Sequence, residues 1–200
     1  MAGWKLFMAA PSELCQRSFR RFGAGATRCP ETGYHDAEIV VDAQFVASPE
    51  EECGANPDAD ERTDPRWPKY CACGYTFHPE DHWQVNVDRL YRGAPDGLLY
   101  QRSELPPGAV WQAHWMEDIK DNPYAGPDGK VWAVMLPAMI EWLVYGPSSD
   151  GTKWKVEGTL PGITVYPSIS QVGHYHGWIK DGVITPDCEG RAFTRHRETA

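Results

Sequence analysis

The sequence predicts a mainly β protein, built as a compact antiparallel sheet system with little helix. Its 19 glycines and 17 prolines fall between short apolar runs, which is typical of many strands joined by turns. Asp-Gly and Pro-Gly pairs recur along the chain, and such pairs favour tight turns because they tolerate positive φ angles. Hydrophobic residues make up 42% of the 200 residues, enough for one sizeable core.

The first part of the chain, residues 1–36, is expected to form an N-terminal extension with one short helix. The segment Ser12–Phe22 begins with a serine that suits a helix N-cap, and Leu14 and Ser18 follow at a spacing of four toward Phe22. Gly23 would end this helix. We therefore expect the extension to lie outside the main β domain.

Residues 37–66 are expected to form one strand followed by an acidic loop. The run 37–46 is rich in β-branched residues, which favours a strand. The stretch 48–66 combines many carboxylates with several prolines and is expected to be extended and mobile.

Residues 67–190 are expected to form the main β-rich domain, and 191–200 a C-terminal tail. Apolar and polar side chains alternate over 83–87 and 153–156, and the runs 130–136 and 141–145 are aromatic or β-branched. The stretch 136–143 would also suit a helical turn. A metal site is expected to close this domain.

The charge of the chain excludes one class of partner. The formal net charge is −9, and the few arginines near the N-terminus are interpreted as a solvated face. The chain therefore lacks the cationic surface that binding to nucleic acid requires. No apolar stretch approaches a membrane span and no export signal is evident, so we expect a soluble protein made in the host cytoplasm, and a location in the virion is a further option. In that reducing setting, metal binding or burial is the better expectation for the six cysteines than disulfide formation.

Two short motifs a hundred residues apart predict a zinc site. Cys71 and Cys73 flank a single alanine and precede Gly74, and His174 and His176 flank Tyr175. Residues spaced by two on an extended strand point to the same side, so each pair could offer two ligands. Neither pair alone fills the four positions that structural zinc takes, but together they do. We therefore predict zinc bound by Cys71, Cys73, His174 and His176.

Other residues offer alternative ligands. Cys29 with His35, and Cys53, could form a second metal site or supply the ligands that Cys71 and Cys73 lack. His78 and His82 are spaced like a helical metal pair, but Pro79 favours a loop with solvated histidines.

The C-terminal motifs resemble a family of small, poorly characterised proteins found in phages and bacterial mobile or defence operons. The resemblance rests on Cys71-Ala72-Cys73-Gly74, Pro167-Ser168-Ile169 and the run from His176 to Ile184, and spans roughly 67–184. It implies zinc ligands at Cys71, Cys73 and His176. The family's remaining cysteine falls on Gly173 here, next to His174. The resemblance implies no established activity.

These observations favour a non-enzymatic, zinc-stabilised protein that binds other proteins, as a phage accessory or virion component or as a homo-oligomer. Tryptophan is enriched at the centres of protein interfaces, and five are candidate interface residues: Trp111, Trp115, Trp132, Trp142 and Trp154. One alternative is a metal-dependent hydrolase or transferase accessory that uses the same zinc. Another is a carbohydrate-binding module that stacks sugars on Trp111, Trp115 and Trp132. The common catalytic motifs are absent from the sequence, and His114, Glu117 and Asp118 are the best acid/base set.

Overall fold

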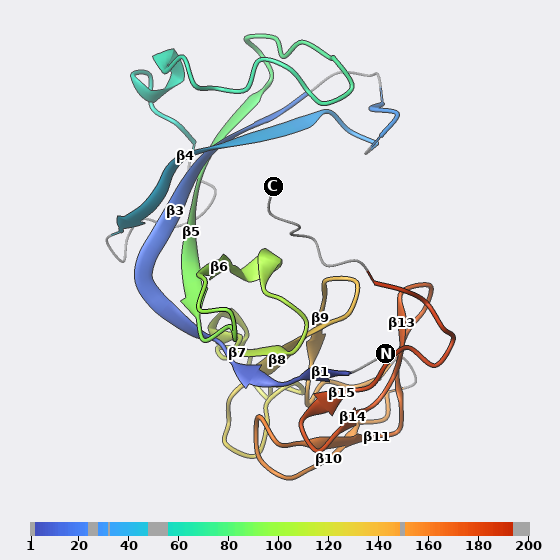
Figure 1. The fold of residues 1–200 in the computed structure, drawn as a ribbon. Coiled ribbons are helices and arrows are strands. Elements are labelled where there is room, and N and C mark those ends of the chain that lie inside the picture. The colour runs from blue at the N-terminus through green and yellow to red at the C-terminus, as the bar shows by residue number, and fades with distance from the viewer. Residues whose placement is uncertain (1–2, 24–27, 32, 48–55, 149–150, 194–200) are drawn as a thin grey trace. The chain divides into compact units, whose positions relative to one another are not determined.

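The computed structural model describes the chain except for residues 1–2, 24–27, 32, 48–55, 149–150 and 194–200, and it confirms the predicted mainly β fold class (Figure 1). The strands are β1 Trp4–Lys5, β2 Phe7–Met8, β3 Ala10–Phe22, β4 Asp36–Val46, β5 His82–Arg92, β6 Tyr100–Gln101, β7 Ala109–Gln112, β8 Trp132–Leu136, β9 Ile140–Leu143, β10 Lys155–Glu157, β11 Thr164–Tyr166, β12 Ile169–Gln171, β13 Tyr175–Gly177, β14 Ile179–Lys180 and β15 Val183–Ile184. Helical structure in this described part is limited to the 3₁₀ turns η1 Glu61–Thr63, η2 Arg102–Glu104 and η3 His114–Met116. None of its helices has the length and apolar character needed to cross a membrane.

The chain divides into two compact units, and both boundaries fall inside strands. Unit 1 comprises residues 1–10 and 91–200, and unit 2 comprises Pro11–Leu90. The division differs from the predicted one, which separated 1–36, 37–66 and 67–190. Strands β4, β3 and β5 are neighbours in one sheet, so the segments 11–36 and 67–90 belong to the same unit.

The predicted helix over Ser12–Phe22 is corrected by the structure, because this segment belongs to strand β3. Strand β3 pairs antiparallel with β4, and the register between them shifts at Arg17. Such irregularities interrupt the strict alternation of a strand. As a result the buried residues include Ser12, Cys15, Ser18 and Arg21, a spacing of three that resembles a helical face.

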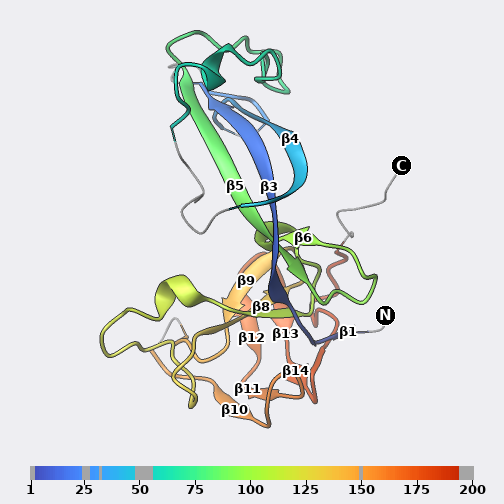
Figure 2. The same cartoon turned by 90° about the vertical axis from the view of Figure 1, so that its left-hand side faces the viewer.

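Strands β4 and β5 confirm the predictions for 37–46 and 83–87. Figure 2 shows β4, β3 and β5 as long neighbouring strands. Strand β5 buries Val85 and Val87, whereas most of β4 is partly or fully exposed. In the described sheet β4 forms one edge and β6 forms the other. Three small clusters form the core of the described part of unit 2, around Phe19, Trp67 and Val85, around Cys15, Ala47 and Val87, and around Cys29, Cys71 and Phe77.

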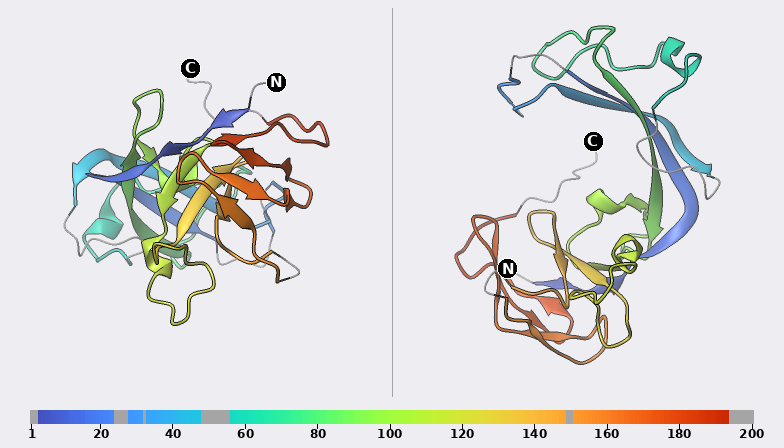
Figure 3. Two further views of the ribbon diagram at one scale, coloured as in Figure 1. Left: turned by 90° about the horizontal axis from the view of Figure 1, so that it is seen from below. Right: turned by 180° about the vertical axis from the view of Figure 1, so that it is seen from behind.

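Unit 1 holds the larger core. The sheet β2-β7-β8-β9 contains one parallel pair, β2 with β7, and is otherwise antiparallel. The remaining strands form β1-β15-β14 and the hairpins β10-β11 and β12-β13 (Figure 3). The predicted strands over 130–136, 141–145 and 153–156 are present as β8, β9 and β10. The stretch 136–143 contains a tight turn in which Ala138 and Met139 adopt positive φ, so it is a β-hairpin and not a helical turn.

Candidate metal centre

Four potential metal ligands meet in unit 2: Cys29, His35, Cys71 and Cys73. Their ligand atoms all lie within 4.8 Å of one another, and only Cys73 is partly exposed. Cys71 and Cys73 are thus side by side, as the C-x-C motif predicted. The cluster takes its other two members from Cys29 and His35, the alternative pair of the sequence, rather than from His174 and His176.

Cys71 and Cys73 are presented by a short knuckle, the hairpin-like segment Lys69–Phe77. The N–H of Cys71 donates to the Tyr75 carbonyl at 2.9 Å, and the N–H of Gly74 donates to the Cys71 carbonyl at 2.9 Å. Gly74 has a φ of 88°, a conformation that side chains with a Cβ rarely adopt. The glycine of the C-x-C-G motif therefore lets the chain turn tightly enough to aim both sulfurs to one point.

Cys29 and His35 lie in the connection between β3 and β4. The N–H of Gly33 donates to the Cys29 carbonyl at 2.9 Å, which forms a turn between the two ligands. At the base of this connection the N–H of Gly23 donates to the His35 carbonyl at 2.9 Å. A Cβ at Gly23 would lie 2.9 Å from the Cβ of His35, so only glycine allows this close approach. Pairing of β3 with β4 therefore brings both ligands to the same end of the sheet.

The distances fit a tetrahedral ion. The Sγ atoms of Cys29 and Cys71 are 3.9 Å apart, and Cys73 Sγ lies 3.3 Å from His35 Nδ1. A tetrahedral zinc with bonds of about 2.3 Å to sulfur and about 2.0 Å to nitrogen would space its ligands by about 3.8 Å and 3.5 Å respectively. A disulfide would need the sulfurs at about 2.05 Å. The four residues therefore could hold a metal ion as they stand.

The surroundings of Cys73 favour its neutral thiol in the absence of a cation. The backbone N–H of Tyr75 favours the thiolate of Cys73, but partial burial and the neighbouring thiols of Cys71 and Cys29 outweigh it and raise the Cys73 pKa. Desolvation is the largest of the effects that raise this pKa, and a bound divalent cation would favour the thiolate instead. This arrangement is typical of a site that exchanges protons for a metal.

Aromatic side chains shield the cluster from water. The rings of His35 and Tyr75 are stacked with centroids 3.9 Å apart, and Phe77 packs with Cys29 and Cys71. Stacking on Tyr75 fixes the plane of the His35 ring, which helps to hold Nδ1 in position.

Two buried charged residues, Arg21 and Asp81, contact the knuckle and the residue that follows it. The guanidinium of Arg21 lies 3.8 Å above the ring of Trp83, and it donates to the His78 carbonyl. Burial lowers the pKa of Arg21, although nearby Asp81 opposes this effect. Asp81 accepts hydrogen bonds from the His78 N–H at 2.7 Å and from the Tyr75 hydroxyl at 3.3 Å. His78 itself is exposed, as its position next to Pro79 predicted.

The other predicted ligands belong to unit 1 or fall outside the described residues. His174 is exposed in unit 1, and His176, on β13, contacts Ser168 and Glu189. Cys53 lies outside the described residues. In the sequence, His35 follows Cys29-Pro30 and directly precedes a predicted strand. The spacing between Cys29 and His35 matches no standard zinc motif.

The five candidate interface tryptophans differ in exposure. Trp111 and Trp142 are buried in the core of unit 1, and Trp132 and Trp154 pack partly buried against it. Trp115 is 51% exposed, and the Arg102 guanidinium lies over its ring at 4.2 Å. Burial of Trp111 removes it from the predicted sugar-stacking surface. The proposed acid/base pair His114 and Glu117 lies on the surface, 3.7 Å apart.

Comparison of the chain with family models, curated proteins and solved structures finds no match.

Proposed function

We propose that the chain is a zinc-stabilised protein-interaction protein in which the metal at Cys29, His35, Cys71 and Cys73 serves folding and performs no chemistry. The observation that carries this proposal is the four-residue cluster itself. Three sulfurs and one imidazole in tetrahedral array are typical of structural zinc sites. The ion would tie the β3–β4 connection to the knuckle before β5.

A closed set of four protein ligands argues against the alternative function, that of a metal-dependent hydrolase or transferase accessory. Catalytic zinc sites keep three protein ligands and leave a position for water. Here the fourth position is taken by a side chain from the same unit, and the aromatic rings of Tyr75 and Phe77 lie beside the sulfurs.

We expect purified protein to contain one equivalent of zinc, bound through the four clustered residues. Cys29→Ser and His35→Ala should each reduce the zinc content measured by elemental analysis, because each removes one of four ligands. His174→Ala and His176→Ala serve as matched controls and should keep the full equivalent. Loss of zinc in the His176 variant but not in the Cys29 variant would instead support the ligand set that the sequence first suggested.

The interaction surface that we favour is the edge strand β4. Its side chains Ile39, Val40 and Val46 are 42%, 47% and 71% exposed, which is unusual for three apolar residues on one strand. Exposed edge strands pair readily with an added strand because their outer backbone groups are available. We therefore propose that an extended segment of a partner protein docks along β4.

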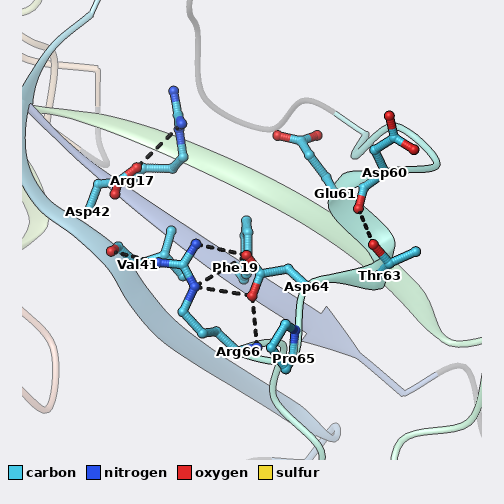
Figure 4. A pocket seen from close by; sticks show the side chains of 10 residues that line it. All are labelled: Arg17, Phe19, Val41, Asp42, Asp60, Glu61, Thr63, Asp64, Pro65 and Arg66. Atoms are coloured by element: carbon cyan, nitrogen blue, oxygen red, sulfur yellow. Dashed lines mark hydrogen bonds and ion pairs between the residues drawn. The ribbon is translucent and has the colours of Figure 1, made fainter.

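The charge beside β4 indicates the chemistry of that segment. Asp and Glu outnumber Lys and Arg in unit 2. A shallow pocket next to β4 is lined by Asp42, Asp60, Glu61 and Asp64, with Arg17 and Arg66 as its cations (Figure 4). Arg17 pairs with Asp42 and Arg66 pairs with Asp64, which leaves the pocket with excess negative charge. A partner strand that alternates apolar residues with Lys or Arg fits this surface.

We expect a fluorescent peptide of alternating Val and Lys to bind the protein, and one of alternating Val and Glu not to bind. Val40→Lys should weaken binding of the basic peptide by about tenfold or more in fluorescence polarisation, because it sets like charges together. Val183→Lys, at an exposed position of β15 in unit 1, is the matched control and should leave binding unchanged. Dimers that Val40→Lys dissociates in light scattering would show instead that a second copy of the chain occupies the edge.

The phage or bacterial mobile-element setting, including a virion role, rests on the resemblance of the C-terminal motifs. The carbohydrate-binding alternative would need rings aligned on one face, and the burial of Trp111 gives it no support.

A further inference from the structure

Three polar side chains in unit 1 form a continuous hydrogen-bonded chain: Ser168, His176 and Glu189. Ser168 Oγ lies 3.1 Å from His176 Nε2, and His176 Nδ1 lies 3.1 Å from Glu189 Oε1. A carboxylate can only accept a hydrogen bond, so a neutral imidazole must carry its proton on Nδ1. Nε2 is then the acceptor for the serine hydroxyl, as a general base for that hydroxyl must be.

The β12–β13 hairpin sets the first of these contacts. Ile169 is paired with Gly177, and Ser170 is paired with His176 in antiparallel register. Ser168 directly precedes β12 and is close enough to the His176 ring for its hydroxyl to reach Nε2. His176 therefore lies within a strand and Ser168 directly beside one, so the hairpin register sets their separation.

A buried carboxylate sets the second contact. Asp187, whose side chain is fully buried, accepts hydrogen bonds from the N–H groups of His176 at 2.7 Å and Glu189 at 2.8 Å. Arg191 donates to Asp187 at 2.9 Å and also lies 3.3 Å from Glu189 Oε2. Burial alone would raise the Asp187 pKa, but these hydrogen bonds hold it below its usual range. Asp187 and Arg191 thus fix the turn that presents Glu189 to the imidazole.

We propose that Ser168, His176 and Glu189 form a catalytic triad that hydrolyses carboxylic esters, an activity of unit 1 that is separate from the proposed zinc site of unit 2. Ser168 is the nucleophile, His176 is the general base, and Glu189 is a positioning residue that orients the imidazole.

The reaction balances with water as the only co-reactant. Ser168 Oγ attacks the ester carbonyl and its proton passes to His176 Nε2, which then protonates the departing alcohol as the carbon–oxygen bond of the ester breaks. A water molecule next gives its proton to Nε2 and attacks the acyl-serine. The acid product leaves, and the proton returns to Ser168 Oγ.

The surroundings of the triad indicate an ester with an apolar acyl group. Ser168 and His176 are both partly accessible, so a reagent can reach them. The ring of Trp178 is stacked beside His176 at 6.2 Å, and Tyr166 is exposed two residues before Ser168. These rings offer apolar contact area close to the nucleophile. The same hydrogen bonds could merely fasten the C-terminal turn to the hairpin, and reactivity distinguishes the two roles.

The test uses the full chain with a biotinylated alkyl fluorophosphonate, which reacts with activated serines, and with p-nitrophenyl butyrate. We expect the phosphonate to label the wild-type protein once, at Ser168, as located by peptide mass spectrometry. Ser168→Ala should abolish both labelling and ester hydrolysis. His176→Ala should slow them by about a hundredfold or more, the usual contribution of a general base. Glu189→Gln should slow labelling, and Glu189→Asp should restore part of the rate.

Ser170→Ala is the matched control, because Ser170 lies two residues away on the same hairpin and should label normally. Melting temperatures of all variants show whether each one folds. A folded wild-type protein that the phosphonate leaves unlabelled would overturn the triad, as would labelling at Ser170 or at another residue. Zinc content plays no part in this readout, so the test stands apart from that of the proposed zinc site.

Discussion

Removing the metal should unfold unit 2 and leave unit 1 folded. The proposed zinc would join the β3–β4 connection to the knuckle, two segments that otherwise meet in one small cluster around Cys29, Cys71 and Phe77. Structural zinc contributes on the order of 10 kcal/mol in small peptides, which is comparable with the whole stability of a domain. We therefore expect calorimetry of chelator-treated protein to lose one transition, with a change in the fluorescence of Trp67 and Trp83.

Single substitutions provide the controls for this experiment. Cys71→Ser should reproduce the effect of the chelator, because it removes a buried ligand. Cys188→Ser should not, because Cys188 is exposed and lies outside the cluster. A calorimetric profile that stays unchanged after verified loss of zinc would show that the four residues pack without needing the ion.

The fold class could be predicted because it depends on local patterns. Short β-branched runs and Asp-Gly turns act within a few residues, and β4, β5, β8 and β10 appeared where those patterns placed them. Strand β3 was missed for a physical reason. The helix prediction rested on Ser12 as an N-cap and on the spacing of four between Leu14, Ser18 and Phe22. Of these last three only Ser18 is buried, and pairing with β4 makes the segment a strand.

That one error also concealed half of the metal centre. With 12–22 as a helix, Cys29 and His35 lie in a connection with no defined neighbour. With 12–22 as a strand paired to β4, the same residues close the end of a hairpin next to the knuckle. Cys71 and Cys73 could be found from sequence because their C-x-C-G spacing is local. Their partners depend on strand pairing across the chain, which spacing does not encode.

The Ser168–His176–Glu189 contacts depend on the same kind of long-range information. Pro167-Ser168-Ile169 and His176 were recognised as motifs in the sequence, but His176 was predicted to be a metal ligand. The antiparallel register of β12 with β13, and the turn held by Asp187, are what bring the three side chains together.

The five tryptophans predicted to form an interface include both core and surface residues. We therefore expect variants that truncate Trp111 and Trp115 to differ strongly in stability. Trp111→Ala should destabilise unit 1 by about 3–5 kcal/mol, the usual cost of deleting a large buried aromatic side chain. Trp111 is fully buried among Leu105, Ala133 and Met135, so truncation leaves a cavity that its neighbours cannot fill. Trp115→Ala should cost less than about 1 kcal/mol, since half of that side chain already faces water and its main contact is the Arg102 guanidinium.

Denaturant unfolding monitored by circular dichroism measures both variants on the same transition, that of unit 1. If Trp111 were an interface anchor rather than a core residue, its truncation would spare the isolated chain and weaken only association, and the two variants would unfold together. A large separation between their midpoints places Trp111 in the core. The aromatic surface left for partners would then centre on Trp115, whose ring is exposed at the η3 turn and could be tested by the same substitution in a binding assay.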